Sequence, residues 1–142
     1  MMTVSNELIE KLKEFEGLRL EAYLDAAGVP TIGYGHTGDV LMGDRITEYW
    51  AGELLKEDLE QIEVAINEMH VARTQGQFDA LVSFAFNIGT GRLKRSRLLK
   101  CIRRGMSRNE IRSEFKRWVF AGGKPLKGLV KRREWEANRF FD

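Results

Sequence analysis

The sequence is poor in cysteine and histidine and has no long apolar run. Its single cysteine, Cys101, cannot form an intramolecular disulfide, and with only His36 and His70 beside it no structural-zinc cluster is possible. No stretch approaches the roughly 20 apolar residues of a membrane-spanning helix. The first 15 residues carry five charges where a secretory signal needs an apolar run. We therefore expect no metal site, no signal peptide and no stable membrane insertion.

Proline is also rare, and the glycines are clustered. The chain has 142 residues, of which 43% are apolar and two are proline. This length and composition favour one globular domain with a sizeable core. Glycine is concentrated in residues 28–43, 89–91 and 122–128. The segments outside these clusters hold few glycines and no proline, and they are expected to be mainly helical.

The net charge of +2 conceals two opposite halves. Residues 1–70 hold 15 acids and 5 bases, net −10, whereas residues 71–142 hold 6 acids and 18 bases, net +12. Such an asymmetry points to a polyanionic partner. Nucleic acid and anionic cell-envelope material are both compatible with the charge alone.

Apolar spacing predicts an α+β fold. A helix is expected over Leu8–Phe15, short strands over residues 22–43, and one long helix from Thr47. The long helix is expected to bury Trp50, Leu54, Leu55, Leu59, Ile62, Ile66 and Met69. Two further helices are expected to begin at capping-box pairs, Thr74 with Gln77 and Ser107 with Glu110. Gly89 is expected to end the first of these helices. A last helix is expected from about Gly128 to Phe141. The prediction is a mainly helical domain with one small sheet, and with Cys101 buried as a small hydrophobe.

Glu16 lies where a carboxylate is unexpected. On a helical wheel it falls inside the apolar arc of Leu8, Ile9, Leu12 and Phe15, and it is the last residue before Gly17. Partial burial and the negative end of the helix dipole both disfavour its charged form. This suits a carboxylic acid that donates a proton. A carboxylate neutralised by an arginine from the basic half explains the position equally well.

Asp25 and Thr31 supply a second carboxylate and a hydroxyl. Asp25 opens a turn nine residues after Glu16, and Thr31 begins the apolar segment that follows. Taken alone, Asp25 is most simply a turn residue. Together with Glu16, however, the set provides an acid, a base and a group that holds water, which is the pattern of glycosidic bond cleavage.

The segment from Phe15 to His36 resembles the phage-type lysozymes, or endolysins, of glycoside hydrolase family 24. It carries Glu-x8-Asp-x5-Thr followed by Ile-Gly-x-Gly-His, a specific match over 22 residues. The likeness continues in Phe78-Asp79-Ala80-Leu81, in Phe86-Asn87-Ile88-Gly89, and in Trp118 with the segment from Gly128 to Glu134. The resemblance implies a lysozyme-like fold, with a single domain over residues 1–142. Its small β lobe would span about 18–45, and its helical lobe about 70–142 plus the N-terminal helix.

The implied activity is that of a muramidase. Such an enzyme hydrolyses the β-1,4 bond between N-acetylmuramic acid and N-acetylglucosamine in bacterial peptidoglycan, without metal or cofactor. Glu16 would be the general acid, and Asp25 and Thr31 would handle the attacking water. An inverting reaction would place the two carboxyl groups about 6.5–9.5 Å apart.

Further roles follow from the same resemblance. Thr37, Phe86 and Asn87 would contact substrate, and either Arg132 or Arg133 would pair with the catalytic glutamate or serve the substrate site. His36 would form a structural ion pair. The enzyme is expected to be a monomer, to wait in the host cytoplasm for a holin, and to act on the wall in the periplasm. Some relatives carry an N-terminal export anchor instead.

Three other functions are compatible with parts of the sequence. Nine bases between residues 73 and 111 suggest nucleic-acid binding, but the aromatic residues there lie on an apolar face and are poor stacking platforms. We therefore expect no nucleic-acid partner. A catalytically inactive wall-binding module has no need of the intact set of Glu16, Asp25 and Thr31. A lytic transglycosylase would yield a 1,6-anhydro product in place of a reducing end.

Overall fold

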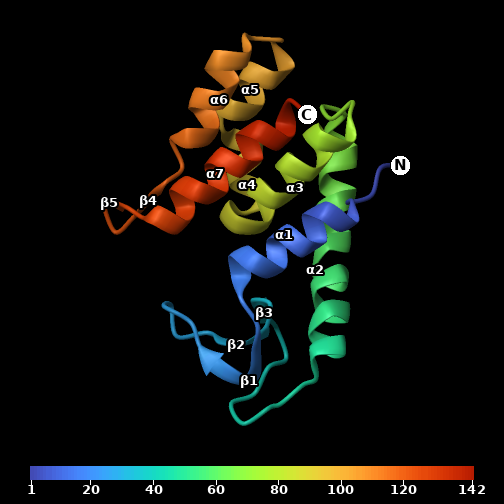
Figure 1. The fold of residues 1–142 in the computed structure, drawn as a ribbon, viewed down its shortest axis with the longest axis vertical. Coiled ribbons are helices and arrows are strands. Elements are labelled where there is room, and N and C mark those ends of the chain that lie inside the picture. Colours follow the sequence, from blue (N-terminus) through green and yellow to red (C-terminus); the bar gives the residue numbers. More distant parts are fainter. The chain divides into compact units, whose positions relative to one another are not determined.

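The computed structural model describes all 142 residues, and it is mainly helical (Figure 1). The elements in chain order are α1 (Asn6–Glu16), β1 (Arg19–Leu24), β2 (Pro30–Gly33), β3 (His36–Thr37), α2 (Glu48–Met69), α3 (Gln75–Ile88), α4 (Thr90–Arg95), α5 (Arg97–Arg103), α6 (Arg108–Lys116), β4 (Phe120–Ala121), β5 (Lys124–Pro125) and α7 (Lys127–Phe140). They confirm the predicted α+β class.

The chain forms two compact units. Residues 6–61 make up the first, called here the sheet unit, and residues 1–5 with 62–142 make up the second, the helical unit. Helix α2 contributes its first part to the sheet unit and its last part to the helical unit. The sheet unit also contains α1, whereas the sequence analysis grouped the N-terminal helix with the helical lobe.

The sheet unit is built on a three-stranded antiparallel sheet in the order β1-β2-β3. Thr31 lies at its centre, with Tyr23 opposite it on β1 and Thr37 opposite it on β3. The start of α2 packs on this sheet, since a Cβ on Gly33 would lie 3.3 Å from the Cβ of Ala51. This close approach explains why a glycine occupies the end of β2.

The predicted burial of Trp50 is wrong. Trp50 is 58% exposed, with its ring edge-on to that of Tyr49. The buried stripe of α2 begins one residue later, at Ala51, and continues through Leu55 and Leu59 at four-residue intervals. A residue one position before that stripe is turned about 100° away from it, so Trp50 faces solvent.

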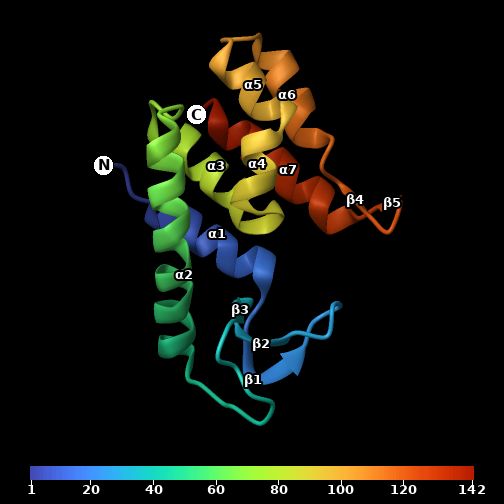
Figure 2. The same ribbon diagram turned by 180° about the vertical axis from the view of Figure 1, so that it is seen from behind.

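The core of the helical unit is formed around α3 (Figure 2). Helix α3 packs on α7 and α4, while α6 packs on α7 and α5. Phe84 is wholly buried and meets the rings of Phe115 and Trp118 edge-on, at 5.6 Å between centroids in each case. Cys101 is 5% exposed, as predicted.

The predicted caps of two helices are present. Thr74 Oγ1 accepts a hydrogen bond from the Gln77 backbone N–H at 3.1 Å, and Ser107 Oγ accepts one from Glu110 N–H at 3.2 Å. Gly89 ends α3 with a φ of +97°, a conformation that favours glycine. Polar side chains thus satisfy the backbone donors that a helix start leaves unpaired.

The prediction of a single sheet is wrong. Strands β4 and β5 form a second, two-stranded ladder, with Phe120 opposite Pro125. Gly122 and Gly123 connect these strands, both at positive φ. A two-residue turn with both residues at positive φ matches the twist of an antiparallel hairpin. The Gly-Gly pair in the sequence indicates such a turn, but strands of only two residues show no alternating pattern that would predict them.

Candidate active site

Glu16 is the last residue of α1 and is half-buried. Its Oε1 atom lies against Gly35, because a Cβ at that position would come within 2.9 Å of it. Gly35 has a φ of +82°, in the left-handed region. Glycine is therefore required at position 35 twice over, for the backbone conformation and for the approach of the carboxylate. Gly35 is part of the Ile-Gly-x-Gly-His motif, but the motif alone does not indicate this role.

Asp25 holds the turn between β1 and β2 with one carboxylate oxygen. Oδ1 accepts hydrogen bonds from the backbone N–H groups of Ala27 and Val29, each at 2.9 Å. Oδ2 has no hydrogen-bond partner within the protein, and the side chain is partly exposed. One oxygen thus fixes the carboxylate, and the other is available to water or substrate.

Thr31 is joined to Asp25 through a single residue, Val29. The Thr31 hydroxyl donates to the Val29 carbonyl oxygen at 2.9 Å, and the Val29 N–H donates to Asp25. Thr31 is only 3% exposed. Thr37, the predicted sugar contact, lies opposite Thr31 on β3 and is exposed. The sheet therefore brings Asp25, Thr31 and Thr37 to neighbouring positions.

His36 contacts the carboxylate of Asp58, a partner that suits the predicted ion pair. Its Nδ1 lies 2.8 Å from Asp58 Oδ2 and 3.0 Å from Oδ1. The pair ties β3 to α2 within the sheet unit. This contact accounts for His36 without a catalytic role.

The other predicted residues lie in the helical unit, at the end of α3 and on α7. Phe86 is half-buried and Asn87 is exposed. Arg133 is wholly buried, and its Nη2 donates to Asn87 Oδ1 at 2.5 Å. Arg132 is 4% exposed and donates from Nη2 to the Ser83 carbonyl oxygen at 2.9 Å. Each guanidinium group thus donates a hydrogen bond to α3, Arg133 to Asn87 and Arg132 to Ser83.

Glu136 is a buried carboxylate that the sequence analysis missed. Its Oε2 accepts from Ser83 Oγ at 2.5 Å and from Arg132 Nε at 3.3 Å, and its Oε1 lies 3.1 Å from Arg133 Nε. Burial raises the pKa of Glu136, and the two arginines oppose that change. Burial likewise lowers the pKa of Arg133. The spacing of Glu136 from these arginines, three and four residues on one helix, was the available signal.

The eight predicted site residues thus fall into two groups. Glu16, Asp25, Thr31 and Thr37 belong to the sheet unit, and Phe86, Asn87, Arg132 and Arg133 belong to the helical unit. No three histidine, cysteine, aspartate or glutamate side chains are grouped so that they could hold a metal ion. The chemical groups available are carboxylates, a threonine hydroxyl and buried guanidinium groups.

Comparison with known proteins identifies the family. A family model described as phage lysozyme matches residues 13–136. The endolysin of Bacillus phage B103 is 44% identical over 147 residues, covering 99% of this chain but 54% of that protein, so the chain spans about half the length of this relative. Other relatives carry the name SAR-endolysin, among them one from Bacteriophage PS119.

Solved structures agree with this assignment. The muramidase domain of SpmX from Asticaccaulis excentricus superimposes with a TM-score of 0.91 at 37% identity, covering 100% of this chain and 99% of that one. A mutant of P22 lysozyme superimposes with a TM-score of 0.85 at 39% identity, with both chains covered completely. The predicted lysozyme-like fold is therefore confirmed, and the chain belongs to the phage lysozyme family.

Proposed function

We propose that this chain is an endolysin-type muramidase that hydrolyses the β-1,4 bond between N-acetylmuramic acid and N-acetylglucosamine in peptidoglycan. The observation that carries the proposal is the pair of unlike carboxylates in the sheet unit. Glu16 is half-buried against Gly35, and Asp25 keeps one oxygen without a protein partner. Two carboxylates in different environments suit an acid and a base. Family membership and the muramidase name of a structural relative support the same activity.

In this mechanism Glu16 protonates the oxygen of the leaving sugar as the glycosidic bond breaks. Asp25 Oδ2 accepts a proton from a water molecule whose oxygen bonds to the anomeric carbon. The Thr31 hydroxyl, which donates to Val29, retains lone pairs to accept a hydrogen bond from that water. The products are two shorter glycans, one with a new reducing end, and Glu16 and Asp25 return to their starting states by proton exchange with solvent.

Substrate contacts are proposed on both units, which would act together as a single lysozyme domain over residues 1–142. Thr37 and Asn87 are exposed and offer polar groups to the sugars, and Phe86 offers part of an aromatic face. Arg133 would serve the substrate through Asn87, whose amide oxygen it holds. Arg132 would help to position Arg133, because both arginines contact the Glu136 carboxylate.

Peptidoglycan is the proposed partner, and the chain would act on the wall as a monomer after a stay in the host cytoplasm. Two routes to the wall are considered. One requires a holin, and the other is suggested by the relatives named SAR-endolysin and requires none. None of the helices has the length and apolar character needed to cross a bilayer.

The test compares two glutamate-to-glutamine variants of α1. Glu16→Gln removes the acidic proton but keeps the shape of the side chain, so we expect clearing of permeabilised bacteria to fall by about 10²–10⁴-fold. Glu14→Gln is the control, because Glu14 is exposed on the same helix and pairs only with Lys11, at 3.2 Å. This variant should clear at the wild-type rate.

The outcomes separate the possible functions. A Glu16→Gln chain that retains its thermal transition and clears bacteria normally contradicts the proposed acid. A wild-type chain that sediments with purified walls and never releases fragments indicates the inactive wall-binding module. Release of 1,6-anhydro fragments indicates a transglycosylase.

A further inference from the structure

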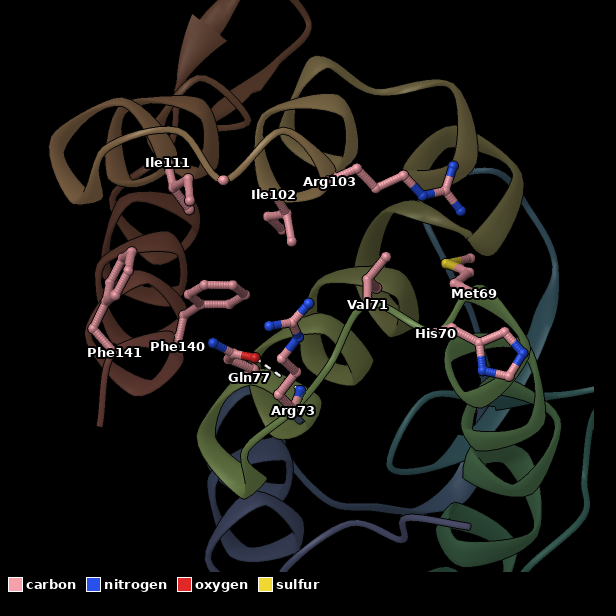
Figure 3. A pocket seen from close by; sticks show the side chains of 11 residues that line it. Met69, His70, Val71, Arg73, Gln77, Ile102, Arg103, Ile111, Phe140 and Phe141 are labelled. Atoms are coloured by element: carbon pink, nitrogen blue, oxygen red, sulfur yellow. Dashed lines mark hydrogen bonds between the residues drawn. The ribbon is translucent and has the colours of Figure 1, made fainter.

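A cavity of about 360 Å³ lies within the helical unit, formed by residues of α2, α3, α5, α6 and α7 and of the segments between them. Figure 3 shows the side chains of Val71, Ile102 and Phe140 pointing toward its centre from three different segments. Ile111 of α6 adds to the same apolar wall. The volume lies within the range of about 300–1,000 Å³ typical of small-molecule sites.

Two arginines also line this cavity. Arg73 reaches from the segment before α3 toward the space that Val71 and Phe140 face, and Arg103 extends from α5 above Met69 (Figure 3). Neither guanidinium group forms an ion pair or a side-chain hydrogen bond, and both residues are exposed. The backbone at Arg73 is nevertheless fixed, because its N–H donates to Gln77 Oε1 at 2.8 Å.

The wider surroundings are also basic. The guanidinium groups of Arg108 and Arg112 lie 4.9 and 5.4 Å from the centroid of the Phe141 ring, and that ring lines the cavity. None of the lining residues is acidic.

Three carboxylates sit on neighbouring elements: Glu68, Glu110 and Asp142. Glu110 accepts a hydrogen bond from Ser107, and Asp142 lies 3.5 Å from Arg139. Glu68 lines a neighbouring pocket together with Lys94 and Arg103. Arg103 therefore shares a pocket with a carboxylate, whereas Arg73 lines only the cavity that has no acidic residue in its lining.

We propose that this cavity binds a free single-chain amphiphile with an anionic head group, such as a medium-chain fatty acid. The alkyl chain would lie among Val71, Ile102, Ile111 and Phe140, and the carboxylate would be held by Arg73, with Arg103 adding positive charge to the lining. The apolar side chains of the lining favour contact with the alkyl chain, and guanidinium groups bind carboxylates through paired hydrogen bonds. A bilayer phospholipid carries two long chains, and one cavity of about 360 Å³ accommodates a single short chain better.

Binding here would stabilise the helical unit. The ligand would contact the segment after α2 together with α5 and α7, which are far apart in the sequence. A ligand that binds only the folded state raises its thermal stability in proportion to occupancy. The site is independent of the proposed hydrolase activity, since it includes none of the residues assigned to that reaction.

The experiment follows backbone amide NMR shifts of the full chain during titration with decanoate below its micelle concentration. We expect saturable shifts at Val71, Ile102, Ile111 and Phe140, together with a rise in the thermal transition. Decyltrimethylammonium has the same tail with a cationic head, and acetate has a carboxylate without a tail. Each should bind at least tenfold more weakly than decanoate. Absence of saturable shifts with decanoate overturns the proposal, and so does equal binding of the cationic amphiphile.

Matched double variants test the head-group contact. Arg73→Gln with Arg103→Gln should weaken decanoate binding at least tenfold while the thermal transition without ligand stays unchanged. Arg92→Gln with Arg95→Gln removes the same charge from exposed positions of α4 outside the cavity, and should leave binding intact. Equal weakening in both variants would mean that only the general positive charge matters, and would overturn the assignment. Binding to phosphatidylglycerol vesicles that depends on Arg73 and Arg103, without binding of monomeric decanoate, would overturn it in favour of a membrane surface.

Discussion

The two units treat their carboxylates in opposite ways. In the sheet unit Glu16 and Asp25 are partly exposed, and Asp25 is held through one oxygen by backbone N–H groups. In the helical unit Glu136 has no exposed surface and shares its oxygens between Ser83 and two buried arginines. Asp25 Oδ2 is therefore open to a substrate, whereas the Glu136 carboxylate is buried among polar side chains of its own unit.

From this difference we expect the carboxylates of the sheet unit to affect activity and the buried carboxylate of the helical unit to affect stability. A buried carboxylate between guanidinium groups balances charges that would be costly to leave alone, so its loss is expected to destabilise the fold. A partly exposed carboxylate held by backbone donors contributes little to the core, so its loss is expected to affect chemistry. Four predictions test this contrast, beginning with the largest effect.

Glu136→Gln should lower the free energy of unfolding by about 3–5 kcal/mol, because two buried guanidinium groups lose their counter-charge. Urea denaturation of the full chain measures this change. Glu134→Gln is the control, an exposed position on the same helix, and it should stay within about 0.5 kcal/mol of wild type. A loss below about 1 kcal/mol for Glu136→Gln would show that the buried cluster is not important for stability.

Asp25→Asn should reduce the clearing rate about 100-fold, equivalent to about 2.7 kcal/mol in the activation barrier. Its stability should change by less than about 1 kcal/mol, because an asparagine Oδ1 can still accept from Ala27 and Val29. Clearing and thermal unfolding are measured on the same preparation. Asp39→Asn is the control on an exposed loop of the same unit. Full activity of Asp25→Asn would remove this residue from the mechanism.

Gly35→Ala should reduce the clearing rate about tenfold, or about 1.4 kcal/mol, because the new Cβ would displace the Glu16 carboxylate. Gly28→Ala is a matched control, since Gly28 has a similar φ of +79° but nothing within 4 Å of the added Cβ. Both variants bear the strain of a positive φ, and only Gly35→Ala should lose activity beyond its loss of stability. Equal activity of the two would argue against a positioning role for Gly35.

Ser107→Ala should have the smallest effect, a loss of about 0.5–1 kcal/mol in the free energy of unfolding through the missing cap of α6. Ser113→Ala, at an exposed position inside the same helix, should be neutral or slightly stabilising. Clearing rates should be unchanged in both. A loss of activity at Ser107 would mean that the helical unit affects catalysis more widely than proposed.

The sequence was sufficient to predict features that depend on neighbours along the chain. The hydroxyl caps Thr74 and Ser107 and the glycine that ends α3 all act within four residues, and all are present. The β4–β5 hairpin was missed because two-residue strands carry no periodic pattern. The orientation of Trp50 was missed because its burial depends on Gly33, 17 residues away, which lets Ala51 approach the sheet.

The same distinction between local sequence and tertiary packing applies to the candidate site. The motif predicts Glu16, Asp25 and Thr31 as candidates because all three lie within one short segment. The partners of Arg132 and Arg133 could not be assigned from spacing alone, since Ser83 and Asn87 lie about 50 residues earlier and are brought close only by the packing of α3 on α7. The role of Gly35 likewise required the position of the Glu16 carboxylate.

The most direct measurement of the proposed reaction is the identity of the new glycan ends released from purified peptidoglycan. Reduction with borohydride, hydrolysis and mass spectrometry distinguish the two sugars at those ends. The proposed mechanism predicts reduced N-acetylmuramic acid from the wild-type chain and almost none from Glu16→Gln. Reduced N-acetylglucosamine, or a 1,6-anhydro muramic acid end, would contradict it.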